Sequence, residues 1–182
     1  MKEVQLYDRR FSVSIGADEI NQAVQKVADK INKDYEGKNP LFLVVLNGAF
    51  MFASDLLKKV TIDCEISFVK LSSYSGTEST HVVRELIGLD EVLTDRYVIV
   101  VEDIIDTGIT MENTIQKLKH LQAADVKIAT LLFKPKAFQK AYNIDYIGLE
   151  IPNGFIVGYG LDYDGLGRNL PDIYKVIEPT KK

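Results

Sequence analysis

Apolar side chains in residues 18–35 recur every three or four positions, the spacing that places them on one face of a helix. The members of this stripe are Ile20, Val24, Val27, Ala28 and Ile31. Gly37 follows the stripe, as glycine commonly does after the end of a helix. The pattern therefore predicts a first helix over about residues 18–35.

The next apolar residues form continuous runs, which are typical of strands buried on both faces of a sheet. The first run, Leu41–Leu46, is followed by a short helical pattern through residues 52–57, and a longer helical pattern covers residues 111–121. Further strands are predicted over residues 62–71, 82–89, 97–101, 126–133 and 146–151. Strands that alternate with helices favour an α/β fold with a mostly parallel, twisted sheet flanked by helices.

Residues 72–81 are polar and show no periodicity. A loop of this length inside a compact domain is usually functional or mobile. Because strands are predicted on both sides of it, we expect the loop to project from the sheet as a flap. The 182 residues contain no internal repeat or linker, so we expect a single domain.

The composition excludes several classes of protein. Its 46% hydrophobic and 26% charged residues are ordinary for a globular domain, and no apolar run is long enough to predict a membrane span. A net charge of −4 and a pI near 5.3 give no support to a nucleic-acid or anionic-membrane surface. Cys64 is the only cysteine, which excludes an internal disulfide, and we expect it to be a small core residue of a strand. Without a signal-peptide pattern at residues 1–5, a reducing cytoplasm is the expected location.

The most informative segment is residues 97–110. Five apolar or aromatic residues predict a buried strand, Glu102 and Asp103 follow at its C-terminal end, and Asp106 opens a loop before the next helix. In open α/β sheets, ligands bind outside the carboxyl ends of the strands. A loop at a helix N-terminus suits a phosphate, and the acids upstream suit ribose hydroxyls and a hard divalent cation. The segment therefore predicts a site for a sugar phosphate.

The candidate phosphate loop is Asp106-Thr107-Gly108-Ile109-Thr110. The backbone N–H groups of its last four residues are expected to point into one concavity, and the two threonine hydroxyls add donors. Gly108 permits a backbone shape that a side chain would block. The loop needs no positive side chain because the amides and the helix dipole supply the field. Walker-type spacing is absent, which excludes an ATPase loop.

The run Val101-Glu102-Asp103-Ile104-Ile105-Asp106-Thr107-Gly108 resembles the signature of the type I phosphoribosyltransferases, in detail that of their hypoxanthine-guanine branch. The resemblance extends from Leu41 to about Ile177. It implies the fold of that family, with a core of about residues 38–150, a small hood from residues 1–16 and 151–182, and a mobile flap over residues 72–83.

The resemblance also implies an activity. Members of this branch transfer the 5-phosphoribosyl group from phosphoribosyl pyrophosphate to N9 of a 6-oxopurine in purine salvage. Hypoxanthine is the expected base, with guanine as the second, giving IMP or GMP and pyrophosphate. Mg²⁺ is the implied cofactor, and a homodimer or homotetramer is the implied assembly, with no nucleic acid or membrane as partner.

The resemblance carries roles to residues of the central segment. Glu102 and Asp103 would hold the ribose 2′- and 3′-hydroxyls, directly or through magnesium. Asp106 would lie near purine N7 as general base, since transfer to N9 requires a ring proton to leave. Asp106 is also placed to cap the following helix, and the two roles are compatible. Lys134 would donate to O6 of the purine, which favours 6-oxopurines over adenine, whose 6-amino group is a donor.

The C-terminal third supplies further positions by resemblance. Phe155 would stack on the purine face, with core packing as its competing role, and the Ile156 backbone would meet the base edge. Asp162 would bind a second magnesium ion, and Arg168 would bind the pyrophosphate through its planar fork of donors.

Two loops complete the resemblance. Asn47 and Gly48 match the loop that contacts pyrophosphate, often through a non-proline cis peptide bond. The family often has lysine before this glycine, so Asn47 removes a positive side chain and leaves the backbone role intact. Ser73 and Tyr74 begin the flap, which in the family closes over the reaction centre and excludes water.

Three other functions fit parts of the pattern. A phosphoribosyltransferase-like regulator that binds RNA would keep the donor loop, but the acidic chain lacks a basic cluster. An enzyme of the same fold acting on a pyrimidine or adenine would not need Lys134. A receiver-type phosphoacceptor would carry its acidic pair after the first strand rather than at residue 102. The choice among hypoxanthine, guanine and xanthine stays open.

Overall fold

The computed structural model describes residues 2–73, 83–87 and 92–178, and within these ranges the chain forms two sheets and three helices. The larger sheet has the strand order β5-β4-β3-β6-β7-β8. Its strands are β3 (Leu41–Leu46), β4 (Glu65–Ser73), β5 (Val83–Ile87), β6 (Tyr97–Ile105), β7 (Asp125–Phe133) and β8 (Tyr146–Glu150). All neighbours pair in parallel except β5, which pairs antiparallel with β4. The predicted α/β class with a mostly parallel sheet is confirmed.

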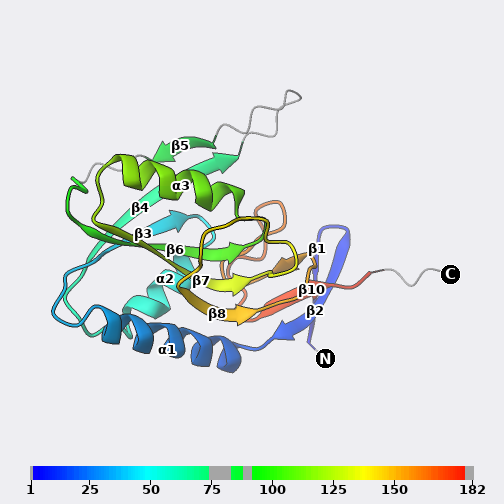
Figure 1. The fold of residues 1–182 in the computed structure, drawn as a ribbon. Helices are drawn as coiled ribbons and strands as arrows, with labels where there is room; N and C mark the ends of the chain where they lie inside the picture. The colour runs from blue at the N-terminus through cyan, green and yellow to red at the C-terminus, as the bar shows by residue number, and fades with distance from the viewer. Residues whose placement is uncertain (1, 74–82, 88–91, 179–182) are drawn as a thin grey trace.

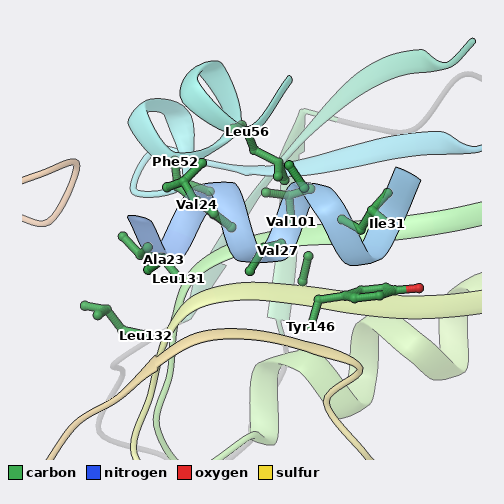
Figure 2. Packing of buried hydrophobic residues seen from close by; sticks show 14 of the residues in the cluster. Ala23, Val24, Val27, Ile31, Phe52, Leu56, Val101, Leu131, Leu132 and Tyr146 are labelled. Atoms are coloured by element: carbon green, nitrogen blue, oxygen red, sulfur yellow. The ribbon is translucent and has the colours of Figure 1, made fainter. Parts of the chain in front are cut away.

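Helices cover both faces of this sheet (Figure 1). The helices α1 (Ala17–Asp34) and α2 (Phe50–Leu57) pack on one face, and α3 (Ile109–His120) packs on the other. The predicted stripe of α1 is buried, and Figure 2 shows Val24, Val27 and Ile31 directed at α2 and the sheet. Burying an aliphatic side chain of this size stabilises a fold by about 1.5–3 kcal/mol, so this stripe supplies much of the core.

A smaller antiparallel sheet joins the two ends of the chain. It has the order β1-β2-β10-β9, formed by β1 (Glu3–Leu6), β2 (Arg9–Ile15), β9 (Ile156–Val157) and β10 (Ile173–Val176). Figure 1 shows the arrowheads of β6, β7 and β8 directed toward this sheet. It therefore lies beyond the carboxyl ends of the parallel strands, where ligands of α/β sheets bind.

Two predicted strand boundaries are wrong by three residues or more. The central strand runs to Ile105 rather than ending at residue 101, because β6 stays paired with β7 up to Ile105↔Phe133. Glu102 and Asp103 therefore lie inside a strand. The strand predicted over residues 62–71 begins at Glu65, so Cys64 precedes it and is half-buried. Residues 74–82 of the predicted flap lie outside the described ranges.

In the described part of the chain, no helix is both long enough and apolar enough to cross a membrane.

Candidate active site

Three neighbouring strands of the larger sheet end at one edge and bring distant residues together there. Gly48 follows β3, Asp106 follows β6, and Lys134 follows β7. Because β3, β6 and β7 are adjacent and parallel, their carboxyl ends share this edge. The segment after β9, around Gly160, closes against it, since a Cβ on Gly160 would overlap the Gly48 carbonyl.

Glu102 and Asp103 of β6 lie on opposite sides of the site. Successive side chains of a strand point to opposite faces. Glu102 lines a hollow of about 130 Å³ together with residues 104–111, on the side of α3. Asp103 lies on the other side and packs against Gly48, because a Cβ built on Gly48 would overlap the Asp103 carboxylate. The acidic pair therefore borders both the phosphate loop and the Gly48 loop.

Burial perturbs both carboxyl groups. Desolvation raises the pKa of Glu102 well above its ordinary value, and the charge of Asp103 adds to this. Desolvation also raises the pKa of Asp103 to about 6. The N–H of Ile104, which donates to Asp103 Oδ1 over 2.7 Å, and the charge of Arg168 both oppose that rise. Among the described residues neither acid forms an ion pair, so a cation would relieve the cost of ionising them.

The Asp103 shift predicts a pH-dependent cost to stability. The folded protein binds the Asp103 proton more tightly than the unfolded chain does, because the pKa rises from 3.8 to about 6 on folding. The cost of ionisation is absent below the lower pKa, grows between the two values and is fully present above the higher one. We expect Asp103→Asn to raise the free energy of unfolding at pH 7.5 by about 1–3 kcal/mol.

Urea denaturation of the metal-free protein at several pH values measures this cost. The gain from Asp103→Asn should shrink toward zero near pH 4. Asp63→Asn, which removes an exposed carboxylate, is the control and should show little change at any pH. A gain that is the same at pH 4.5 and pH 7.5 would contradict the assignment.

The phosphate loop forms the start of α3. Gly108 is the N-cap residue, with φ of 82°, a conformation that side chains disfavour and glycine adopts freely. Its carbonyl accepts the N–H of Glu112 over 3.0 Å, the first hydrogen bond of the helix. Thr107 Oγ1 accepts the N–H of Ile109, the first residue of the helix, over 3.5 Å, whereas the Asp106 carboxylate accepts from Lys134. The expected capping role of Asp106 is therefore wrong. The loop residues 106–110 line the same hollow as Glu102.

Asp106 instead pairs with Lys134. Lys134 Nζ lies 2.7 Å from Asp106 Oδ2, and the Lys134 N–H donates to the carbonyl of Ile105 over 3.0 Å. Lys134 is buried, whereas the Asp106 side chain is about half exposed. A buried ammonium and a reachable carboxylate thus stand side by side at the end of β6 and β7.

Phe155 directly precedes β9 of the smaller sheet and lines a hollow with residues 8–10 and 176–178, in which neither Asp106 nor Lys134 takes part. Its ring packs on Tyr163 and Phe11, with ring centres 5.6 and 6.1 Å away, and the Arg9 guanidinium lies 5.5 Å from its centre. The residue remains 40% exposed. Core packing therefore accounts for only part of the surface of Phe155. Ile156 follows as the first residue of β9 and is partly buried.

Asp162 and Arg168 are joined in one loop. Arg168 Nη2 lies 2.7 Å from Asp162 Oδ1, and Arg168 Nη1 donates to the Gly160 carbonyl over 2.7 Å. The second Asp162 oxygen accepts the N–H of Gly165 over 2.7 Å. These bonds direct the arginine toward the strand ends, where its charge lowers the pKa of Asp103. Next to this loop, the peptide bond between Leu46 and Asn47 is cis, one bond before the Asn47–Gly48 peptide.

Comparison with known proteins identifies the fold. Residues 16–164 match the family model described as the phosphoribosyl transferase domain. The chain belongs to the phosphoribosyl transferase family. The hypoxanthine-guanine phosphoribosyltransferase of Streptococcus pneumoniae R6 is 43% identical over 162 residues, covering 88% of this chain and 90% of that protein. The enzyme of the same name from Lactococcus lactis is 41% identical and covers 87% of each chain.

Solved structures of this family have the same fold as this chain. A hypoxanthine-guanine phosphoribosyltransferase of Bacillus anthracis superposes with a TM-score of 0.86 at 37% identity, covering 91% of this chain and 98% of that one. A Trypanosoma cruzi hypoxanthine phosphoribosyl transferase also gives 0.86, at 31% identity, covering 96% and 95%. The RNA-binding regulator considered from the sequence finds no support among these relatives.

The structure does not test the roles that the phosphoribosyl transferase resemblance assigns to Ser73 and Tyr74. The backbone of Ser73 ends β4, while its side chain and the whole of Tyr74 lie outside the described residues. The roles of these two residues therefore stay predictions.

Sequence reasoning missed three residues that surround the phosphate loop of this phosphoribosyl transferase. Phe138, Lys140 and Tyr142 lie between β7 and β8 and pack against Gly108. This segment follows Pro135 and shows no clear periodicity. The one signal in the sequence is its two aromatic residues in a polar connection, which indicates packing but does not reveal the partner.

Proposed function

We propose that this chain transfers the 5-phosphoribosyl group from phosphoribosyl pyrophosphate to N9 of hypoxanthine, and of guanine. The products are IMP or GMP and pyrophosphate. The observation that carries the proposal is the pair Asp106–Lys134, 2.7 Å apart, whose acid lines the phosphate-loop hollow. Relatives named hypoxanthine-guanine phosphoribosyltransferase cover nearly the whole chain and support this choice.

The ribosyl donor binds along the strand ends. Its 5′-phosphate enters the hollow of residues 106–110, where backbone N–H groups at the start of α3 face it. Glu102 lines the same hollow and accepts from a ribose hydroxyl. The pyrophosphate extends toward Gly48 and Arg168, whose guanidinium Asp162 orients.

The base binds between the strand ends and the smaller sheet. Phe155 stacks on one purine face, and the Lys134 ammonium donates to O6. Asp106 accepts the proton from N7 as N9 bonds to C1′, and the electron pair of the breaking C1′–O bond leaves with pyrophosphate. Its ion pair with Lys134 keeps the Asp106 carboxylate oriented toward the same purine edge.

Magnesium fits the donor set of this site. The described residues contain no cluster of three or more acids, histidines or cysteines, so protein ligands alone would not enclose an ion. Mg²⁺ typically binds one or two carboxylates and completes its shell with water and substrate phosphates. Glu102, Asp103 and Asp162 would supply these carboxylates. When bound, the ion would offset negative charge on the pyrophosphate leaving group.

A spectrophotometric assay tests the proposal. Phosphoribosyl pyrophosphate and magnesium are supplied with hypoxanthine, guanine, xanthine, adenine or uracil in separate reactions. We expect nucleotide formation from hypoxanthine and guanine and none from adenine or uracil, because Lys134 is a donor. Turnover of adenine or uracil alone would overturn the base assignment. A folded protein that binds the donor yet uses no base would overturn the enzyme assignment.

An exposed apolar surface on β4 suits the association of this chain with a second copy. Ile66 and Phe68 are each 46% exposed. Ile66 pairs with Phe42 of β3, and Phe68 pairs with Val44. Phe42 and Val44 are buried under α1 and α2. Ile66 and Phe68 therefore lie on the same face of the sheet, but outside the area that these helices cover. We propose that a second copy of this chain covers them. In the Trypanosoma cruzi relative, the C-terminal region has a role in the oligomeric state and enzymatic activity of that enzyme.

Light scattering after gel filtration tests this assembly. The wild-type chain should elute as a dimer or tetramer, and Phe68→Glu should shift it to monomer because a desolvated charge opposes burial. Val92→Glu adds the same charge at another exposed apolar residue and should leave the assembly unchanged. A monomeric wild-type chain would contradict the proposal.

A further inference from the structure

Three side chains between β7 and β8 form a brace behind the phosphate loop. A Cβ built on Gly108 would meet Phe138 Cε2 at 2.6 Å, the Tyr142 hydroxyl at 2.7 Å and Lys140 Cγ at 3.0 Å. We call Phe138, Lys140 and Tyr142 the brace. Its close fit explains why this position requires glycine for space as well as for its positive φ.

The brace is anchored in the core. The Phe133 and Phe138 rings lie 5.3 Å apart at 77°, and the Phe138 and Tyr142 rings lie 5.2 Å apart at 90°. Edge-to-face pairs of this kind are favourable for aromatic rings. Phe133 ends β7, and all three rings pack on the hydrophobic cluster under α3. The brace therefore connects the phosphate loop to a rigid strand.

The brace and its neighbour hold two carbonyl groups of the loop. The Tyr142 hydroxyl donates to the Gly108 carbonyl over 2.8 Å, and the Gln139 N–H donates to the Thr107 carbonyl over 3.3 Å. The Gly108 carbonyl also accepts the N–H of Glu112 over 3.0 Å, so both of its lone pairs are used. Lys140 Nζ in turn pairs with Glu112 Oε2 over 2.7 Å.

Holding a carbonyl also orients an amide. In a trans peptide unit the C=O and the following N–H point in opposite directions within one plane. With the Gly108 carbonyl held toward Tyr142 and the Glu112 N–H, the Ile109 N–H is directed away from them, and its acceptor in the loop is Thr107 Oγ1 at 3.5 Å. A rotated peptide would instead turn a carbonyl oxygen toward the phosphate and repel it.

We propose that Tyr142 is a positioning residue of the phosphate loop, which holds the Gly108 carbonyl back so that the loop amides face the donor's 5′-phosphate. The inference rests on the proposed function, because it assigns the loop to that phosphate. Burial raises the pKa of Tyr142 to about 12, with the charges of Glu112 and Glu102 adding to the rise. The hydroxyl therefore remains a donor throughout the working pH range.

Tyr142→Phe tests this role because it removes the hydroxyl and keeps the ring. We expect the KM for phosphoribosyl pyrophosphate and the Kd for ribose 5-phosphate each to rise about three- to tenfold, the range of one lost hydrogen bond. The KM for hypoxanthine should change less than twofold, since Lys134 and Phe155 are untouched. Steady-state kinetics and calorimetry measure these values.

Tyr146→Phe is the matched control. Its hydroxyl donates over 3.0 Å to Oδ2 of Asp34, the last residue of α1, away from the phosphate loop. It should leave both the donor KM and the ribose 5-phosphate Kd unchanged. Equal losses in the two variants, or a Tyr142→Phe donor KM within 1.5-fold of wild type, would overturn the positioning role.

Failure of the proposed function gives a different result. A wild-type protein that binds ribose 5-phosphate more tightly than Tyr142→Phe, yet forms no nucleotide, would keep the positioning role and refute the activity. A wild-type protein that does not bind ribose 5-phosphate would refute both.

Discussion

Replacing Asp106 by asparagine is expected to lower the rate of nucleotide formation by about two to four orders of magnitude, the usual loss when a general base is removed. Asparagine keeps the size of the side chain and still accepts a hydrogen bond from Lys134, but it does not take up a proton. The proton on purine N7 then has no acceptor at the moment when N9 bonds to C1′. Substrate binding should suffer less than turnover, because Lys134, Phe155 and the phosphate loop remain.

Steady-state kinetics with hypoxanthine, together with thermal unfolding, measures this effect. The fall should appear in kcat, with both KM values within severalfold of wild type. Asp164→Asn, which neutralises an exposed acid in the loop that carries Asp162, is the control and should retain activity. Turnover of Asp106→Asn near the wild-type rate would show that another group accepts the proton.

Gly48→Ala is expected to lower both the stability of the protein and its catalytic efficiency with phosphoribosyl pyrophosphate. A Cβ at this position would overlap the Asp103 carboxylate, and on its other side the Gly48 carbonyl is already closely approached by Gly160. Relief requires either the acid or the loop to move. Overpacking of this kind costs about 1–3 kcal/mol. We expect the free energy of unfolding to fall by that amount and kcat/KM for phosphoribosyl pyrophosphate to fall at least tenfold.

Gly16→Ala separates this clash from the general effect of a new methyl group. Gly16 is the N-cap residue of α1, its φ is −81°, and a Cβ there would meet nothing within 4 Å. We expect near wild-type urea denaturation and kinetics for this variant. If Gly48→Ala behaves in the same way, the close packing of Asp103 on the Gly48 loop is not required for donor use.

Much of the fold could be predicted from the local pattern. The stripe of α1 and the run of β3 were placed within a residue of their observed ends, because burial on one face or on both leaves a strong periodic trace. The predicted end of β6 at residue 101 is wrong, because polar residues at the end of a strand resemble a loop in the sequence. Only pairing with β7, through Glu102↔Thr130 and Ile105↔Phe133, keeps the acids within the strand.

The sequence by itself determined which groups are available for chemistry. Residues 101–108 form one continuous run, so the acids, the loop hydroxyls and the glycine before α3 are neighbours whatever the rest of the chain does. Their residue types suit a sugar phosphate because hydroxyl, carboxylate and backbone N–H preferences are local properties. This explains why the family could be recognised from one short run of residues.

Only the tertiary structure decided how these groups act together. Lys134 reaches Asp106 across 28 positions because β6 and β7 are adjacent and parallel, and Gly160 closes on Gly48 because the smaller sheet folds over the strand ends. The contact of Tyr142 with Gly108, 34 positions apart, leaves no periodic trace in the sequence. Such contacts depend on the direction of whole strands and loops, whereas hydrophobic periodicity reports only which face of an element is buried.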